Sequence, residues 1–127
     1  MEYHCDLCSQ QDIDYLKKLR QIELGWNEGD EEFNHVRKIT VNKEIVALLE
    51  YNCLVRDYIM EITLFEVIKD MRSEGIGTAI IREIQTLPNI SVYQVLPRNE
   101  NSKKFWERLG FIEKADGIGE SIWIYSK

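Results

Sequence analysis

Apolar residues recur every three or four positions in several stretches of the chain, a spacing that is typical of amphipathic helices. The first stretch follows Ser9, which together with Asp12 resembles a capping box. The last stretch starts at Asn99 or Asn101, because asparagine favours a helix N-cap. The predicted helices cover residues 9–25, 30–36, 76–86 and 99–109.

β-Branched and aromatic residues gather between these helices, which predicts strands. The predicted strands cover residues 3–8, 38–41, 44–51, 58–67, 90–95, 112–115 and 121–125. Because a helix connects strands 58–67 and 90–95, these two should pair in parallel. The order of elements therefore predicts an α/β fold with a mixed sheet. The length of 127 residues suits a single domain over residues 1–127.

Composition argues against two classes of function. The longest apolar run, from Ile45 to Leu49, is far too short to span a bilayer. The net charge of −6, from 16 basic and 22 acidic residues, argues against general nucleic-acid binding, which needs a basic surface. The N-terminus shows no basic stretch followed by an apolar core, so no signal peptide is expected. We expect a cytoplasmic protein with neither a membrane nor a nucleic acid as partner.

Three cysteines raise the question of a metal or disulfide site. An odd number, Cys5, Cys8 and Cys53, in a chain without a secretion signal favours free thiols. His4 and the Cys5-x-x-Cys8 pair would supply only part of a zinc site, which needs four ligands. We therefore expect no metal.

Arg72, Gly75 and Gly77 mark the point where the longest predicted strand passes into a helix. A helix start leaves backbone N–H groups unpaired and favours anions. The glycines let a phosphate approach the backbone closely, and Arg72 adds a positive charge. A tight turn without a ligand would use glycines in the same way. The stretch lacks the Lys of a Walker loop, and Ile80 stands where a dinucleotide fingerprint has its third glycine.

The stretch Arg72-x-x-Gly75-x-Gly77 resembles the Arg/Gln-x-x-Gly-x-Gly/Ala signature of the GNAT superfamily, the acyl-CoA-dependent N-acyltransferases. The second half of the family pattern follows as Asn99, Ser102, Phe105-Trp106 and Leu109-Gly110-Phe111. The resemblance covers about residues 40–125. It implies a GNAT-like domain with a mostly antiparallel sheet that splays open between the fourth and fifth strands, with about four flanking helices. It also implies acetyl-CoA (coenzyme A) as the cofactor.

The resemblance assigns the cofactor site. Backbone groups of Phe65 and Val67 would bind the pantetheine arm, and the amides of residues 73–78 the pyrophosphate. The expected cofactor-binding residues are Phe65, Val67, Arg72, Ser73, Glu74, Gly75, Ile76, Gly77, Thr78, Asn99, Ser102 and Trp106. Asn99 also fits the role of a helix cap without any ligand.

Trp106 departs from the family pattern, which usually has a Tyr that protonates the leaving thiolate. An indole has one N–H donor and cannot act as a general acid. Either the thiolate leaves unassisted, which its modest pKa permits, or another group such as Tyr93 or Tyr125 protonates it. Trp106 also fits a purely structural place in the core.

Glu61 is the predicted general base, because the resemblance extends to a strand glutamate at this spacing that deprotonates the acceptor amine. A carboxylate within an apolar strand is costly unless it has a task or a partner. The alternative is that Glu61 faces solvent or pairs with a basic side chain. Glu66 is the second candidate, although strict alternation along a strand places it on the opposite face from Glu61.

The loop after the first helix usually recognises the acceptor in this family. Here the expected acceptor-binding residues are Trp26, Glu28, Asp30, Glu31 and Glu32, since acids beside an aromatic ring suit a cationic amine. The resemblance implies transfer of an acetyl group to a primary amine of a small molecule or peptide by direct attack, in a monomer or homodimer. An acyl-CoA-binding module with little or no catalysis is the alternative, and a purely structural interaction domain would require both motifs to be coincidental.

Overall fold

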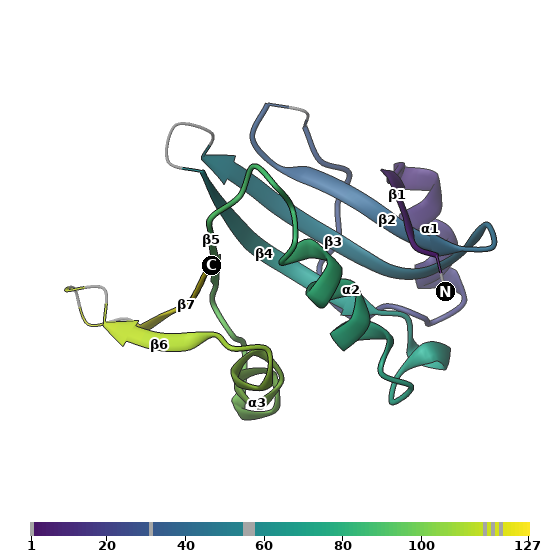
Figure 1. Cartoon of the computed structure of the whole chain (residues 1–127). Helices are drawn as coiled ribbons and strands as arrows, with labels where there is room; N and C mark the ends of the chain where they lie inside the picture. Colours follow the sequence, from purple (N-terminus) through teal and green to yellow (C-terminus); the bar gives the residue numbers. More distant parts are fainter. Residues whose placement is uncertain (1, 31, 55–57, 116, 118, 120) are drawn as a thin grey trace.

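The computed structural model describes residues 2–30, 32–54, 58–115, 117, 119 and 121–127, and its elements form one seven-stranded sheet with three helices (Figure 1). The strands are β1 (His4–Leu7), β2 (His35–Val41), β3 (Glu44–Leu54), β4 (Ile59–Val67), β5 (Val92–Val95), β6 (Ile112–Ala115) and β7 (Ser121–Ser126). The helices are α1 (Gln10–Lys18), α2 (Ile76–Ile84) and α3 (Glu100–Arg108), and a 3-10 turn, η2 (Lys69–Met71), precedes α2.

The sheet is mixed, as predicted. Its strand order is β1-β2-β3-β4-β5-β7-β6, and every neighbouring pair is antiparallel except β4 and β5. These two run in parallel because α2 forms the crossover between them. They pair only from Ile59–Val92 to Ile62–Val95, while β4 continues to Val67. The sheet therefore opens between its fourth and fifth strands, as the resemblance implies.

Each face of the sheet packs against its own hydrophobic cluster. One cluster joins α1 to the sheet through Ile13, Leu16 and Trp26, against Leu48 and Leu64. The other, larger cluster joins α2 and α3 to the opposite face. In Figure 1 these two helices lie in front of the sheet or below it, and α1 lies behind β1 and β2.

A β-bulge interrupts the pairing of β3 with β4. Glu50 lies opposite Leu64, but the next residue of β3, Tyr51, lies opposite Ile62, so Thr63 has no residue opposite it. The extra residue reverses which positions of β4 face which side. Leu64 packs in the α1 cluster, whereas Ile62 packs in the α2 cluster although the two lie two residues apart.

The region after α1 differs from the prediction. Among the described residues between α1 and β2 there is no helix, and β2 begins at His35 instead of residue 38. Asp30 explains the difference, because its Oδ1 accepts hydrogen bonds from the backbone N–H groups of Phe33 (2.6 Å) and Glu32 (3.1 Å). A carboxylate that binds nearby amides in this way favours a turn over a helix.

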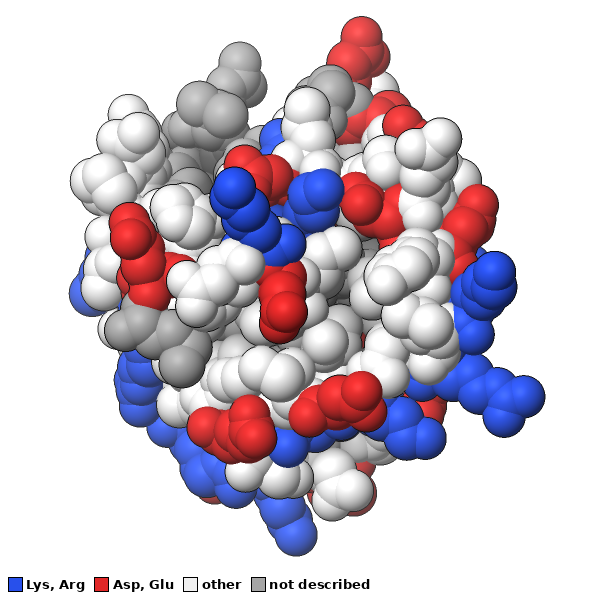
Figure 2. Space-filling view, turned by 90° about the vertical axis from the view of Figure 1, so that its right-hand side faces the viewer, with Lys and Arg blue, Asp and Glu red and all other residues white. Residues whose placement is uncertain are grey.

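No helix in the described part of the chain is long and apolar enough to cross a membrane. On the face that carries the right-hand side of Figure 1, acidic and basic side chains alternate without a continuous patch of one sign (Figure 2). The net charge of −6 is thus not concentrated on this face.

The packing of α2 yields a stability prediction. Ile81 is fully buried at 0% exposure, whereas Ile112 is 63% exposed. Ile81→Ala should lower the free energy of unfolding by about 2–5 kcal/mol, because it leaves a cavity in the core. Ile112→Ala is the matched control and should change it by less than about 0.5 kcal/mol. Urea denaturation of both variants measures the difference, and equal effects would contradict this description of the core.

Candidate functional site

A cleft of about 450 Å³ lies where β4 and β5 diverge. It is walled by β4 on one side and by the chain from the end of β5 into α3 on the other, and two residues of the loop after α1 close one end. The lining residues are Glu23, Leu24, Ile62, Thr63, Leu64, Phe65, Glu66, Val67, Arg72, Val95, Leu96, Arg98, Asn99, Asn101, Ser102, Phe105 and Trp106.

The β4 wall offers unpaired backbone to a ligand. Beyond Ile62, β4 has no partner on the β5 side among the described residues, so part of a sheet edge lies inside the cleft. Phe65 stacks on Phe105 at 6.2 Å between ring centroids and meets Trp106 edge-on at 6.3 Å. The expected cofactor residues Phe65 and Val67 thus line an apolar slot with an open backbone edge, which suits an extended chain that carries amide groups.

The N-terminus of α2 lacks the cap that the other two helices have. Ser9 caps α1 and Asn99 caps α3 with their side chains, but Gly75 precedes α2 without a side-chain hydrogen bond. Ala79 N–H donates to Gly75 O at 3.1 Å, so the amides of residues 76–78 precede the first intrahelical bond. These N–H groups remain available for an anion.

The two glycines of the motif serve different purposes. Gly75 has a φ of +78°, a left-handed conformation, and a Cβ there would meet no atom within 4 Å. Gly77 instead packs closely, since a Cβ would lie 3.2 Å from Val67 Cγ2 and 3.4 Å from Phe105 Cε1. Gly75 therefore shapes the turn, and Gly77 brings α2 close to β4 and α3.

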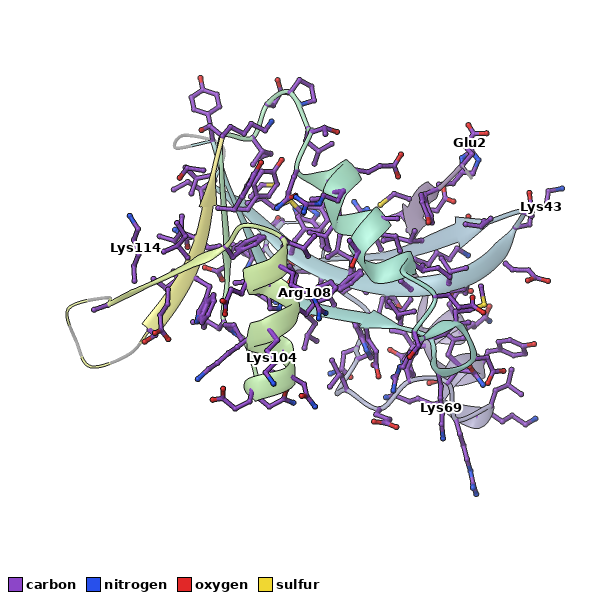
Figure 3. The ribbon with its side chains drawn as sticks, turned by 60° about the horizontal axis from the view of Figure 1, so that its bottom comes forward. Glu2, Lys43, Lys69, Lys104, Arg108 and Lys114 are labelled. Atoms are coloured by element: carbon purple, nitrogen blue, oxygen red, sulfur yellow. The ribbon has the colours of Figure 1, made fainter. Side chains whose placement is uncertain are left out.

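Basic side chains lie on the elements around this turn. In Figure 3, Lys69 projects from η2, which precedes α2, whereas Lys104 and Arg108 project from α3 and do not line the cleft. Arg72 lies in the turn itself and lines the cleft. The turn beside the cleft therefore combines the free backbone amides of α2 with the positive charge of Arg72, the arrangement that favours phosphate groups.

Glu66 and Arg72 form a partly buried ion pair, with Arg72 Nη2 2.8 Å from Glu66 Oε2. The same oxygen accepts the backbone N–H of Glu23 at 2.9 Å, and Oε1 accepts the N–H of Leu24 at 3.1 Å and the indole Nε1–H of Trp26 at 2.8 Å. Arg72 also donates from Nε to Val67 O at 3.0 Å. With both carboxylate oxygens occupied by donors, Glu66 does not offer a free lone pair to an acceptor amine.

Glu61 lies on β4 between Asn52 of β3 and Gln94 of β5, one residue before the β4 residues that line the cleft. It is half-buried, and within the described residues its carboxylate makes no hydrogen bond or ion pair, so the ion-paired alternative is not seen. The expectation that Glu61 and Glu66 face opposite sides is wrong. The bulge at Thr63 reverses the alternation, so both lie on the α1 face.

Glu50, which the sequence analysis did not single out, is a further carboxylate on this face. Thr63 donates a 2.6 Å hydrogen bond to Glu50 Oε1, and Thr63 lines the cleft. Opposite Glu61, Asn52 Oδ1 is buried and has no hydrogen-bond partner in the described part of the chain. A threonine in an otherwise apolar strand was the sequence feature that could have pointed to Glu50. The contact between them depends on the bulge, which the sequence does not reveal.

The aromatic residues near the cleft do not provide a general acid. Trp106 is 4% exposed and packs against Phe65, Phe105 and Phe111, so it forms part of the cleft wall and of the core. Tyr93 does not line the cleft: it is fully buried, its hydroxyl donates to Ile84 O at 2.5 Å, and burial raises its pKa to about 12. Tyr125 is also absent from the cleft lining.

Asn99 and Ser102 both line the cleft at the start of α3. Asn99 Oδ1 accepts the backbone N–H of Ser102 at 2.9 Å, so the capping role that needs no ligand is present. Ser73, Glu74, Ile76 and Thr78 belong to the turn and the first residues of α2, beyond the cleft lining. The cofactor residues thus fall into a lining group and a turn group.

The residues of the acidic loop that were expected to bind the acceptor do not line the cleft, in the part of the loop that the structure describes. Trp26 is 0% exposed, and its indole Nε1–H donates to Glu66 Oε1, so its ring does not face the cleft. Glu28 accepts from Gln10 N at 3.2 Å, and Asp30 binds backbone amides of its own turn. Glu32 is exposed outside the cleft lining, and Glu31 lies outside the described residues.

The loop residues that do line the cleft are Glu23 and Leu24, which the sequence analysis missed. Glu23 has an exposed side chain 4.0 Å from Arg72 Nη1. Arg98 was also missed and lines the opposite wall. Glu23 and Leu24 lie in a stretch without helical or strand pattern, so no periodic signal marked them.

The cysteines lie apart from this site. Cys5, Cys8 and Cys53 are free thiols, and burial, followed by the Asp12 charge, raises the pKa of Cys8 to about 11. Cys5 and Cys53 line a separate apolar pocket of about 730 Å³ between the end of α2 and β1–β3. In the described residues, no three His, Cys, Asp or Glu side chains gather as metal ligands.

The chain matches a known protein family and is similar in structure to known acetyltransferases. A family model described as FR47-like protein matches residues 41–124, whereas a search of curated proteins gives no match. An acetyltransferase from Thermus thermophilus is 15% identical with a TM-score of 0.68, over 100% of this chain and 97% of that chain. The ribosomal-protein-S18-alanine N-acetyltransferase from Escherichia coli is 15% identical with a TM-score of 0.66, over 97% and 91%.

The PaiA N-acetyltransferase from Thermoplasma acidophilum, solved in complex with coenzyme A, is 11% identical with a TM-score of 0.68, over 100% of both chains. At these identities the likeness establishes the fold over the full length of the chain.

The turn before α2 yields a prediction about anion binding. Gly75→Asp places a negative charge beside the free amides and should weaken coenzyme A binding by at least about 30-fold, roughly 2 kcal/mol. Gly75→Asn is the matched control, because Asn has the same size and tolerates the left-handed backbone. It should retain affinity within about fivefold, since only the charge differs. Isothermal titration calorimetry compares the two, and equal affinities would show that no anion binds at this turn.

Proposed function

Because the chain belongs to the FR47-like family and has the GNAT acetyltransferase fold, we propose that it transfers the acetyl group of acetyl-CoA to a primary amine of a small molecule or peptide. The observation that carries the proposal is the cleft between β4 and β5, whose lining includes Arg72 of the turn that leads into the uncapped N-terminus of α2. A structural neighbour with the same fold binds coenzyme A.

The cleft and the adjoining turn suit the pantetheine arm and the pyrophosphate of the cofactor. The free amides of residues 76–78 and the Arg72 guanidinium would bind the pyrophosphate. The open β4 edge at Phe65 and Val67 would pair with the amide groups of the pantetheine arm, between β4 and the aromatic wall of α3. Thr78, Ser73 and Glu74 would contribute at the same turn, and Asn99, Ser102 and Trp106 from α3.

In the proposed reaction the free amine attacks the thioester carbonyl directly. Glu61 takes the proton from the acceptor amine, because it carries the carboxylate on this face that has no partner among the described residues. The unpaired Asn52 Oδ1 opposite Glu61 can accept a hydrogen bond from the same amine. The new C–N bond forms as the C–S bond breaks, and coenzyme A leaves as a thiolate.

The leaving thiolate has no phenol beside it, because no tyrosine in the described part of the chain lines the cleft. A thiolate with an ordinary pKa can leave without an acid. The same feature favours a second candidate function, an acyl-CoA-binding module with little or no catalysis. The two candidates differ in turnover and not in cofactor binding.

Two measurements separate these functions. Saturating coenzyme A should raise the melting temperature by mass action under either one. Acetyl-CoA with a panel of polyamines, amino acids and peptides, followed by a thiol reagent that detects free coenzyme A, should show amine-dependent turnover if the enzyme proposal is correct. Binding without turnover on the whole panel supports the binding module, and the absence of any thermal shift contradicts both.

Glu61→Gln tests the assigned base. Gln is nearly isosteric but cannot take a proton, so turnover should fall by about 10²–10⁴ with the fold and coenzyme A affinity retained. The loss should be largest at low pH, where the amine is mostly protonated, and should shrink as the pH rises. Steady-state rates across pH measure it.

Glu50→Gln is the matched control, because Glu50 is a half-buried carboxylate on the same face that reaches the cleft only through Thr63. It should change the rate by less than about tenfold. A large loss in Glu50→Gln with a small one in Glu61→Gln would move the base to Glu50 and Thr63.

A further inference from the structure

Glu66 is a carboxylate at 7% exposure that neither binds the cofactor in the proposal above nor has a free lone pair for the acceptor. Its four donors come from two different places in the chain. Three belong to residues 23–26 of the loop after α1, and the fourth is Arg72 of the glycine turn. Both places line the cleft.

We propose that Glu66 is a positioning residue, which fixes Glu23 and Leu24 as the acceptor-side wall of the cleft and joins this wall through Arg72 to the cofactor turn. The inference rests on the proposed function, because it assigns how the acceptor side of the same cleft is held. Glu23 is then the side chain that recognises a cationic acceptor at the mouth of the cleft.

The energetics favour a fixed geometry at this point. Burying a carboxylate is costly unless a cation and hydrogen bonds compensate for the lost water, and here both oxygens are occupied. The donor groups of the loop lie 40–43 residues before Glu66 in the sequence, so these hydrogen bonds connect distant parts of the chain. Residues 21–30 form neither helix nor strand, and the bonds to the Glu66 side chain attach residues 23–26 to β4.

Glu23 is suited to recognition because its backbone is held and its side chain is free to act. The N–H of Glu23 binds Glu66, while its side chain is 67% exposed and lines the cleft. Its carboxylate lies 4.0 Å from Arg72 Nη1, a distance at the limit of an ion pair. Since Arg72 pairs closely with Glu66 at 2.8 Å, the Glu23 carboxylate is available to pair with an ammonium group.

Hydrogen exchange followed by mass spectrometry tests the positioning role on the full chain without any substrate. Glu66→Gln removes the charge and turns one acceptor oxygen into a donor. Amide exchange in the peptide that contains residues 22–26 should become at least about tenfold faster, as expected for the loss of charge-assisted hydrogen bonds. Exchange in β3 should stay slow, because the fold remains intact.

Glu23→Gln is the matched control, because it changes the neighbouring exposed carboxylate and leaves the bonds to Glu66 in place. It should not alter exchange of residues 22–26. Arg72→Gln is the second variant in case Glu66→Gln does not fold. It removes the cation that pairs with the Glu66 carboxylate and should accelerate exchange in the same peptide by at least about threefold.

Kinetics test the recognition role with any amine that the panel identifies. Glu23→Gln and Glu66→Gln should each raise KM for a cationic amine by about tenfold or more, with kcat within about threefold, because they remove binding that is equal in the ground and transition states. For an acceptor amine that carries no further positive charge, KM should change much less in the Glu23→Gln variant.

The outcomes separate this inference from the proposed function. Unchanged exchange at residues 22–26, or equal acceleration in every peptide, overturns the positioning role whatever the activity. Local acceleration with no turnover on any amine supports the positioning role and counts against the enzyme. Local acceleration with turnover but an unchanged KM in Glu23→Gln removes Glu23 from acceptor recognition.

Discussion

The parallel pairing of β4 with β5 ends after Ile62 and Val95, and the candidate site depends on this divergence. If the two strands stayed paired, β5 would cover the β4 edge and there would be no cleft. The divergence is maintained because α3 follows β5 and places Phe105 and Trp106 against Phe65. An aromatic wall therefore takes the place of a neighbouring strand, and backbone groups of β4 remain open to a ligand.

A second constraint, the bulge at Thr63, determines which carboxylates lie on the same face of the sheet. Without the extra residue, Glu61 and Glu66 would lie on opposite faces of β4. With it, both carboxylates lie on the α1 face with Glu50, and their surroundings give them different chemistry. Glu66 is occupied by four donors, Glu50 accepts from Thr63, and Glu61 has no partner among the described residues.

Features encoded locally could be predicted from the sequence. The glycine turn, its helix and the parallel crossover follow from short-range spacing, and the structure contains them. The helix expected over residues 30–36 was wrong, because Asp30 binds the amides that a helix would need. The acidic and polar residues around Asp30 showed no apolar periodicity that could distinguish a helix from a turn.

Features that depend on distant contacts could not be predicted. Trp26 was expected to contact the acceptor together with neighbouring acids, but it is buried, and its indole N–H donates to Glu66, 40 residues later. Alternation along β4 predicted the wrong face for Glu66, because a bulge depends on the register with β3. Glu23 acquires its place at the cleft only through the same long-range bonds.

The central claim is that coenzyme A occupies the cleft between β4 and β5. Titration of isotope-labelled protein with coenzyme A, followed by amide chemical shifts, tests it most directly. The account predicts saturable shifts at residues 76–78 and at Phe65 and Val67, all with one dissociation constant. Saturable shifts around Cys5, Cys53 and Ile84, which line the apolar pocket, with none at the α2 N-terminus, would contradict it.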